Sequence, residues 1–171
     1  MLFSLSFLGA AQLSFAATPD SYSAALLKQE VSRQLSTLPY YGVFDNITFR
    51  ISAKRNVMLS GDVTRPGLKR DAEVAIQGIH GVRTVVNDIQ VLPKSPTDDS
   101  IRWEVFKAIF EKPGLQKYAT QTVDPLRIIV RNGVVALDGA VTSRYDRTMI
   151  DECARSVSEA SGVIDNLVIQ S

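Results

Sequence analysis

VMLSGDVT, residues 57–64, returns in the second half of the chain as VALDGAVT, residues 135–142. The likeness continues without a gap over residues 57–91 and 135–169: apolar positions match apolar positions, whereas nearly every polar residue changes. Catalysis would fix particular polar side chains in both copies, so this pattern indicates a duplicated fold rather than a duplicated catalytic site. The sequence therefore predicts two related modules.

Hydrophobic periodicity divides each copy into a helix, two strands, a second helix and a last strand. In the first copy we expect helices at 21–38 and about 66–79, and strands at 47–51, 57–59 and 85–91. In the second copy we expect helices at 100–111 and 144–158, and strands at 126–131, 134–138 and 163–169. Asn132-Gly133 falls between two of these strands and is a strong hairpin signal.

The fold class that follows is α+β: two tandem αββαβ modules, each a three-stranded sheet with two helices packed on one face. Both helices are needed because a module this small must bury enough apolar surface to be stable. We place module 1 at residues 21–92, a linker at 93–99 and module 2 at 100–171. Structural turns are expected at four glycines, which tolerate backbone conformations that other residues avoid: Gly61, Gly139, Gly81 and Gly162.

The first seventeen residues differ from the rest of the chain. They carry no ionised side chain, they are rich in Leu and Phe, and Ser14-Phe15-Ala16 places small residues at the positions that a signal peptidase recognises. We expect residues 1–17 to be a secretory signal peptide cleaved after Ala16, although the usual basic residue at the start is missing. The alternatives are a buried N-terminal helix or a short anchor.

Composition narrows the class of partner. The chain has 171 residues and a formal net charge of +1, so the whole protein has no electrostatic attraction for nucleic acid. Acidic residues never recur as a pair across the two copies: Asp62 meets Ala140, and Asp138 meets Ser60. The sequence thus predicts no enzyme, no small-molecule substrate and no cofactor.

Three further features have ordinary structural interpretations. Cys153 is the sole cysteine and lies on the inward stripe of a predicted helix, so we expect a small buried hydrophobe and no internal disulfide. His80 is the sole histidine and falls at the end of a predicted helix, where we expect it to be solvated and neither catalytic nor a metal ligand. The loop 61–67 lacks the Lys-Ser/Thr pair of a phosphate-binding loop, which favours a turn.

The predicted helix at 100–111 carries more apolar surface than one sheet can cover. Its core stripe is conventional, but Trp103 and Phe110 lie beyond Phe106 and widen the apolar arc to more than half of the circumference. Arg102 and Lys107 border the arc. An aromatic surface edged by cations suits a bilayer interface. The alternative is packing against the first module, for which Tyr40 and Tyr41 are the candidate partners.

The motifs VMLSGDV at 57–63, IHGV at 79–82 and VVNDIQV at 85–91 resemble those of the BON family, named for bacterial OsmY and nodulation proteins. The second copy carries VALDGAV at 135–141 and GVIDNL at 162–167. The resemblance covers nearly everything after the predicted signal peptide. It implies export to the periplasm or outer membrane, no known catalysis, and attachment to phospholipid surfaces, often in envelope stress responses.

We therefore expect a non-enzymatic periplasmic protein, peripheral to a membrane, that binds anionic phospholipid through its second module. The predicted contact residues are Trp103, Phe106, Phe110, Arg102 and Lys107. The alternative is a protein-interaction or chaperone-like module whose apolar surface binds another envelope protein.

Overall fold

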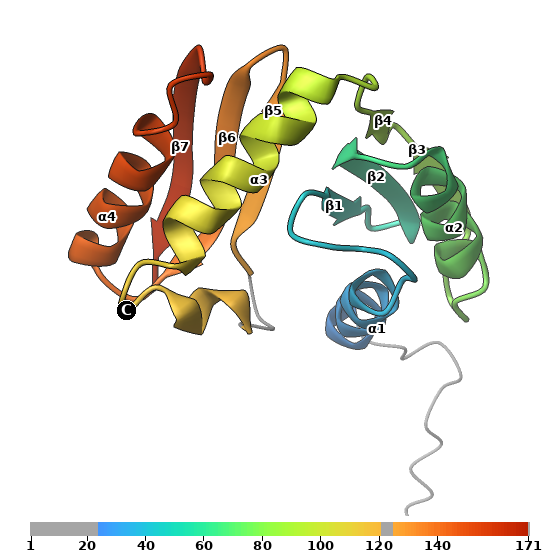
Figure 1. Ribbon diagram of the computed structural model, residues 1–171. Coiled ribbons are helices and arrows are strands. Elements are labelled where there is room, and N and C mark those ends of the chain that lie inside the picture. The colour runs from blue at the N-terminus through green and yellow to red at the C-terminus, as the bar shows by residue number, and fades with distance from the viewer. Residues whose placement is uncertain (1–23, 121–124, 171) are drawn as a thin grey trace, which may run out of the picture.

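Two α/β modules lie side by side in the computed structural model, which describes residues 24–120 and 125–170 (Figure 1). The predicted signal peptide lies outside the described residues. The first module contains the helices α1 (Ala24–Ser36) and α2 (Pro66–Gln77) and the strands β1 (Asn46–Ile51), β2 (Asn56–Val63), β3 (Thr84–Asn87) and β4 (Gln90–Val91). The second module contains α3 (Pro96–Phe110), the 3-10 helix η1 (Gln116–Ala119), β5 (Arg127–Arg131), β6 (Val134–Val141), α4 (Arg144–Arg155) and β7 (Gly162–Ile169).

Both modules have the same topology, which confirms the predicted fold class. In each, the first two strands pair antiparallel, and the second strand pairs parallel with the strands that follow the second helix. Strand order is β1-β2-β3 in the first sheet, with β4 also beside β2, and β5-β6-β7 in the second. Each module has its own hydrophobic core, in which two helices bury their apolar stripes against one sheet face.

The two repeated glycines lie inside strands and not in the turns where we expected them. Gly61 has a φ of +117° and Gly139 a φ of +120°, and β2 and β6 both continue beyond the glycine. A Cβ at Gly61 would collide with the backbone carbonyl of Asn46 on β1. The close approach of a neighbouring strand therefore explains why this position takes a residue without a side chain. Gly81 does lie in a turn, with a φ of +95°, whereas Gly162 is the first residue of β7.

Helix α3 begins earlier than predicted. Ser95 caps it, accepting a hydrogen bond of 3.1 Å from the backbone N–H of Asp98, and Pro96 occupies the first turn. Asp98 and Asp99 therefore belong to the helix, and the segment between β4 and α3 is shorter than the predicted linker.

The last strands of the two modules keep one side-chain interaction in common. The Asn87 side chain accepts a hydrogen bond from the N–H of Ile89 and donates to the carbonyl of Lys69 on α2. Asp165 likewise joins its strand to the second helix of its module: it accepts a hydrogen bond from the N–H of Leu167 and pairs with Arg147 on α4. The residue that replaces Asn87 is therefore Asp165 and not Asn166.

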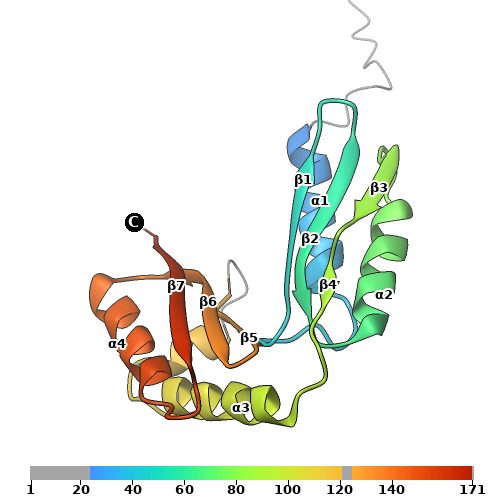
Figure 2. The ribbon, with the colours of Figure 1, turned by 90° about the horizontal axis from the view of Figure 1, so that it is seen from above.

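The modules meet where the turn Gly42–Asp45 lies against the outer edge of β5. The N–H of Ile128 donates to the carbonyl of Val43 at 2.8 Å, and the Arg127 guanidinium donates to the carbonyl of Gly42 at 2.6 Å. The same guanidinium lies over the ring of Tyr41, 4.3 Å from its centre. Viewed from above, the two sheets enclose an open angle, with β1 on the side that faces the second module (Figure 2).

Candidate functional site

Helix α3 is held to its own sheet by two buried polar residues. Arg102 is 3% exposed, and its guanidinium donates to the carbonyl of Val130 at 2.6 Å and pairs with Asp99. Asp98 accepts hydrogen bonds from the backbone N–H groups of Asn132 and Gly133, at 3.0 and 2.8 Å, and so fixes the hairpin turn. Arg102 therefore holds α3 in place and is not a surface cation, contrary to the predicted contact.

Four aromatic rings form a connected group, which we call the aromatic cluster: Phe44, Trp103, Phe106 and Phe110. Phe44 comes from the first module, and its ring centre lies 5.1 Å from that of Trp103 and 6.0 Å from that of Phe106. Trp103 and Phe106 are 5.5 Å apart, and Phe106 and Phe110 are 4.7 Å apart. Edge-to-face contacts at these distances are favourable for aromatic rings.

The sequence left two alternatives open for these aromatic residues, a bilayer-facing surface and packing against the first module, and the cluster has features of both. Phe106 and Phe110 are half-buried and pack against the core of the second module, and Phe44 joins the modules. The partner from the first module is thus Phe44 and not Tyr40 or Tyr41. Trp103, in contrast, leaves 56% of its surface exposed. One part of the indole ring packs against Phe44 and Phe106 at the junction between the modules, and the rest is exposed to solvent.

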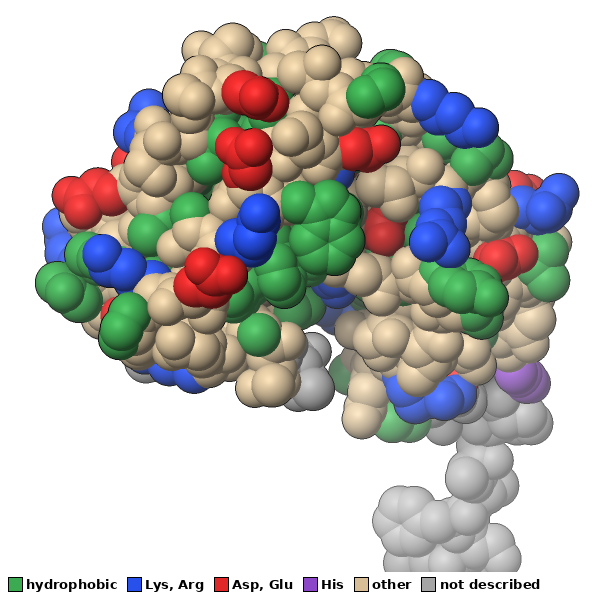
Figure 3. Space-filling model, viewed as in Figure 1, with side chains coloured by type: hydrophobic (Ala, Val, Ile, Leu, Met, Phe, Trp, Pro, Cys, Tyr) green, Lys and Arg blue, Asp and Glu red, His purple; other side chains and the backbone are tan. Residues whose placement is uncertain are grey.

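Charges of both signs surround Trp103. Lys107 is exposed one turn further along α3, while Glu104 and Asp99 lie on the same helix. Figure 3 shows the mixture: hydrophobic side chains gather at the boundary between the modules, with carboxylates and cations beside them. The surface around Trp103 is consequently apolar at its centre and close to neutral at its rim.

Sequence reasoning missed Phe44 and the role of Arg102. Phe44 belongs to the run Tyr40-Tyr41-Gly42-Val43-Phe44, which is rich in aromatic residues for a connection between a helix and a strand. That composition is a usable signal, because solvated loops seldom carry so many large apolar side chains. Nothing local to Arg102 could indicate its burial, since its acceptor, Val130, lies on a strand far along the chain.

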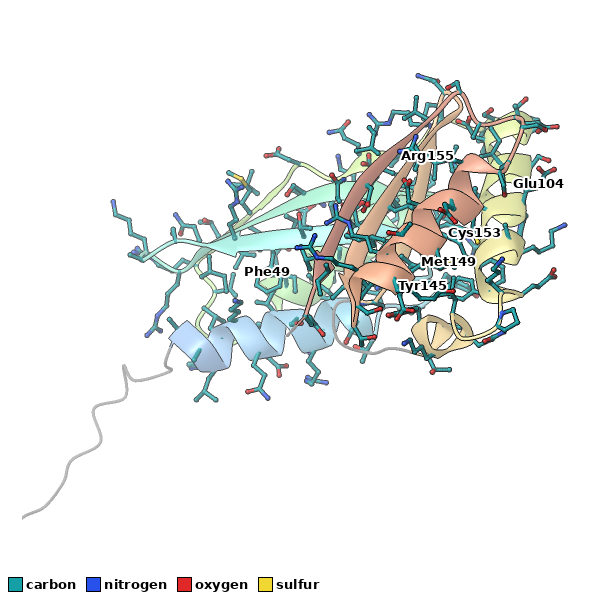
Figure 4. The ribbon with its side chains drawn as sticks, turned by 90° about the vertical axis from the view of Figure 1, so that its left-hand side faces the viewer. Phe49, Glu104, Tyr145, Met149, Cys153 and Arg155 are labelled. Atoms are coloured by element: carbon teal, nitrogen blue, oxygen red, sulfur yellow. The ribbon has the colours of Figure 1, made fainter. Side chains whose placement is uncertain are left out.

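Cys153 behaves as the small apolar residue that we expected. It lies on α4 in line with Tyr145 and Met149 (Figure 4), it is buried in the core of the second module, and burial raises the pKa of its thiol. A raised pKa disfavours the reactive thiolate. Across residues 24–120 and 125–170, no three His, Cys, Asp or Glu side chains come together in a way that could bind a metal ion.

Comparison with known families decides the identity of the modules. A family model described as the BON domain matches the chain twice, at residues 23–93 and 97–171. The chain belongs to the BON family. BON domains are not enzymatic, and they occur in envelope and periplasmic proteins that bind phospholipid or other proteins. The two matches confirm the tandem arrangement predicted from the repeat.

Other comparisons with this BON protein add little. Two solved structures of CdsD, a structural protein of the type III secretion system of Chlamydia trachomatis, are each 11% identical to the chain. The first covers 84% of this chain and 92% of its own, with a TM-score of 0.33; the second, a C-terminal domain, covers 85% and 98%, with a TM-score of 0.30. No curated protein sequence matches.

A helix crosses a bilayer only if it is both long enough and predominantly apolar. Among residues 24–120 and 125–170, no helix combines the length and the apolar character that a membrane span needs.

Proposed function

We propose that this BON protein attaches peripherally to anionic phospholipid in the periplasm, through the α3 surface of its second module. The observation that carries the proposal is the position of Trp103, which is 56% exposed and yet packs edge-on against Phe44 and Phe106. An exposed indole held in one orientation enters an interface without losing much conformational freedom. Lys107 lies beside it and suits an anionic headgroup.

The expected attachment is weak and reversible. A fully buried aromatic side chain contributes about 1.5–3 kcal/mol, and a lysine near an anionic surface about 1 kcal/mol. Trp103 can bury only its exposed part, and Phe106 and Phe110 are already half-buried. Glu104 opposes an anionic surface, whereas the charge of Asp99 is compensated by Arg102. The apolar contribution of Trp103 should therefore dominate.

Trp103 also reports its own environment, because it is the sole tryptophan of the sequence. Vesicles containing phosphatidylglycerol should shift its fluorescence emission to shorter wavelength, and lipids brominated near the headgroup should quench it. Co-sedimentation with the same vesicles at low salt should fall several-fold in Trp103→Ala. Tyr145→Ala is the matched control: Tyr145 is 72% exposed on α4 of the same module, and its loss should leave binding unchanged.

Two results would contradict the proposal: wild-type protein that stays in the supernatant at low salt, or Trp103→Ala that sediments as well as wild type. Circular dichroism of each variant establishes that the fold is retained.

Binding of another envelope protein by the same surface is the second candidate. The carboxylates of Asp99 and Glu104 beside Trp103 favour it, because mixed charge around an apolar centre resembles the rim of a protein interface. A partner that is captured after lipid extraction, and that is lost in Trp103→Ala, would support this candidate over lipid.

A further inference from the structure

The outer edge of β1 carries backbone groups that the first sheet does not use. The N–H of Ile47 points away from β2, because it donates to the Tyr41 hydroxyl at 3.0 Å. Residues of an antiparallel strand alternate in the direction of their backbone groups, so Phe49 and Ile51 also present their N–H and C=O groups to this edge. Within residues 24–120 and 125–170, no backbone hydrogen bond joins Phe49 to a segment outside the sheet.

This edge borders a cleft of about 600 Å³ between the modules. Ile47 and Phe49 of β1 form one wall, and Ser32 and Ser36 of α1 lie beside them. The opposite wall is lined by Asp138 and Gly139 of β6 and by Val168 of β7. Figure 2 shows β1 on the side of the first sheet that faces the second module. A volume of this size falls within the range of ordinary binding pockets.

The second module shows how such an edge is covered. Its first strand, β5, is the equivalent of β1, and the chain's own turn Gly42–Asp45 lies against it. One backbone hydrogen bond joins Val43 to Ile128, while Phe44 packs on Trp103 and Phe106 of α3. The covering segment thus combines a backbone contact to the strand with a large side chain against the module's first helix.

The first helices of the modules differ where that large side chain would lie. Aligning their buried stripes, Leu27, Val31 and Leu35 with Ile101, Val105 and Ile109, places Ser32 and Ser36 where α3 has Phe106 and Phe110. Phe106 receives Phe44 in the second module. In the first module these two positions carry only the small side chains of serine, and both serines line the cleft.

We propose that this cleft binds an extended segment of a partner protein, which adds as a strand to β1 and places a large apolar side chain over Ser32 and Ser36. Strand addition satisfies the backbone groups of Phe49 and Ile51, and alternate side chains of the segment supply specificity. Lys28 and Arg127 line the cleft together with Asp138, and this excess of positive charge favours an acidic residue or a terminal carboxylate in the segment. This site is separate from the α3 surface, and its existence does not depend on lipid attachment.

The test starts from a random library of displayed ten-residue peptides, selected against the full chain. Enriched peptides should carry a large apolar residue, and in NMR spectra of the ¹⁵N-labelled protein they should shift the amide signals of Phe49 and Ile51. The double variant Ser32→Phe/Ser36→Phe fills the space with the residues that α3 already carries. It should weaken peptide binding by about tenfold or more, which is about 1.4 kcal/mol.

The control variant is Ala25→Phe/Gln29→Phe, which adds two phenylalanines to exposed, uncharged positions of α1 that do not line the cleft. It should bind the peptides as wild type does. Since Ser32 and Ser36 are themselves exposed, both double variants should keep the melting temperature of wild type.

Three outcomes would overturn the proposal. They are a library without enriched peptides, enriched peptides that bind the filled variant as tightly as wild type, and amide shifts confined to other surfaces. Monomeric dodecylphosphocholine provides the lipid arm: if it shifts the amide signals of Phe49 and Ile51 while no peptide of the library does, the cleft accepts an acyl chain and not a protein strand.

Discussion

The connection from β2 to α2 and the equivalent connection from β6 to α4 are each fixed by hydrogen bonds to a threonine, but the partner of the threonine differs between the modules. In the first, the buried carboxylate of Asp45 accepts hydrogen bonds from the N–H and hydroxyl of Thr64, at 2.7 and 2.8 Å. In the second, the Tyr118 hydroxyl accepts from the N–H of Thr142 at 2.9 Å and donates to Asp146 at 2.7 Å. Threonine is retained at this connection, while its partner has been replaced by a residue from another part of the chain.

Asp146 makes the stability of the second module dependent on acid. Hydrogen bonds from Lys117 and Tyr118 lower the pKa of its carboxyl group from an ordinary 3.8 to about 2. A carboxyl group whose pKa is lowered on folding stabilises the protein above its unfolded pKa, and this stabilisation is lost as the pH falls through the folded pKa. The contribution of Asp146 is therefore complete near neutrality and disappears between about pH 4 and pH 2.

We predict that Asp146→Asn lowers the free energy of unfolding by about 1–2 kcal/mol near neutral pH, and by much less at about pH 2.5. Urea unfolding of both proteins at the two pH values measures this difference. Asp71→Asn removes an exposed carboxylate on α2 and should change stability little at either pH. A loss in Asp146→Asn that stays the same at both pH values would refute the assignment.

Sequence reasoning at this scale reached Thr64 but not the partners of the threonines at these connections. Thr64 belongs to the repeated motif, and in the structure it stands directly before Arg65, the N-cap residue of α2. Asp45 and Tyr118 reach their partners only through the folded chain, and the segments that precede the first strands differ in length between the modules. The repeat carries no trace of them, since each lies outside the duplicated stretch.

At the scale of elements, helix α3 has a structural face and an exposed face. Its inner face holds the hairpin through Asp98 and Arg102, and its outer face carries Trp103 and Lys107. The order of helices and strands followed from periodicity alone, because burial on one face dictates spacing along the chain. The burial of Arg102 did not follow, because it depends on the carbonyl of Val130, which lies on a strand far along the chain.

Glu104 offers a test of the charge on the outer face of α3. We predict that Glu104→Gln increases the fraction of protein bound to phosphatidylglycerol vesicles by about two- to fivefold at low salt, because it removes a negative charge near the bilayer surface. The gain should vanish at high salt, where screening removes the repulsion. Co-sedimentation over a salt series measures both effects.

Glu152→Gln serves as the control for Glu104→Gln, because it makes the same change of charge at an exposed position on α4. An equal increase in both variants would mean that net charge, and not the α3 surface, governs attachment.

At the scale of the whole molecule, the junction joins two cores that are otherwise separate. It includes the aromatic contact of Phe44, the stack of Arg127 on Tyr41, the ion pair between Arg131 and Asp62, and the hydrogen bonds to the carbonyls of Gly42 and Val43. The sequence offered packing against the first module as one of two alternatives for the aromatic residues of helix α3. It did not identify Phe44, because nothing in the spacing of one module records which face of the other it will meet.

Phe44→Ala should loosen this junction. A buried Phe→Ala change costs about 3–5 kcal/mol, and since Phe44 is half-buried we predict a loss of about 1–2 kcal/mol, with Trp103 emission shifted to longer wavelength in the free protein. Thermal unfolding followed by circular dichroism and by fluorescence gives both quantities.

Tyr40→Ala is the control for the junction, because Tyr40 is 77% exposed and stacks on Arg65 of its own module. It should leave the Trp103 emission unchanged. An unchanged emission in Phe44→Ala would show that Phe44 does not cover the indole ring in solution.

The turn Gly42–Asp45 belongs to the first module but covers part of the second, so the second module depends more on the first than the reverse. A fragment that begins near Lys94 would keep every helix and strand of the second module, yet leave the Ile128 amide and the Phe106 ring without the cover that Val43 and Phe44 provide. The first module would lose no strand partner in the reciprocal cut. The second module therefore depends on the first for the cover of its β5 edge, whereas the sheet of the first module is complete without the second.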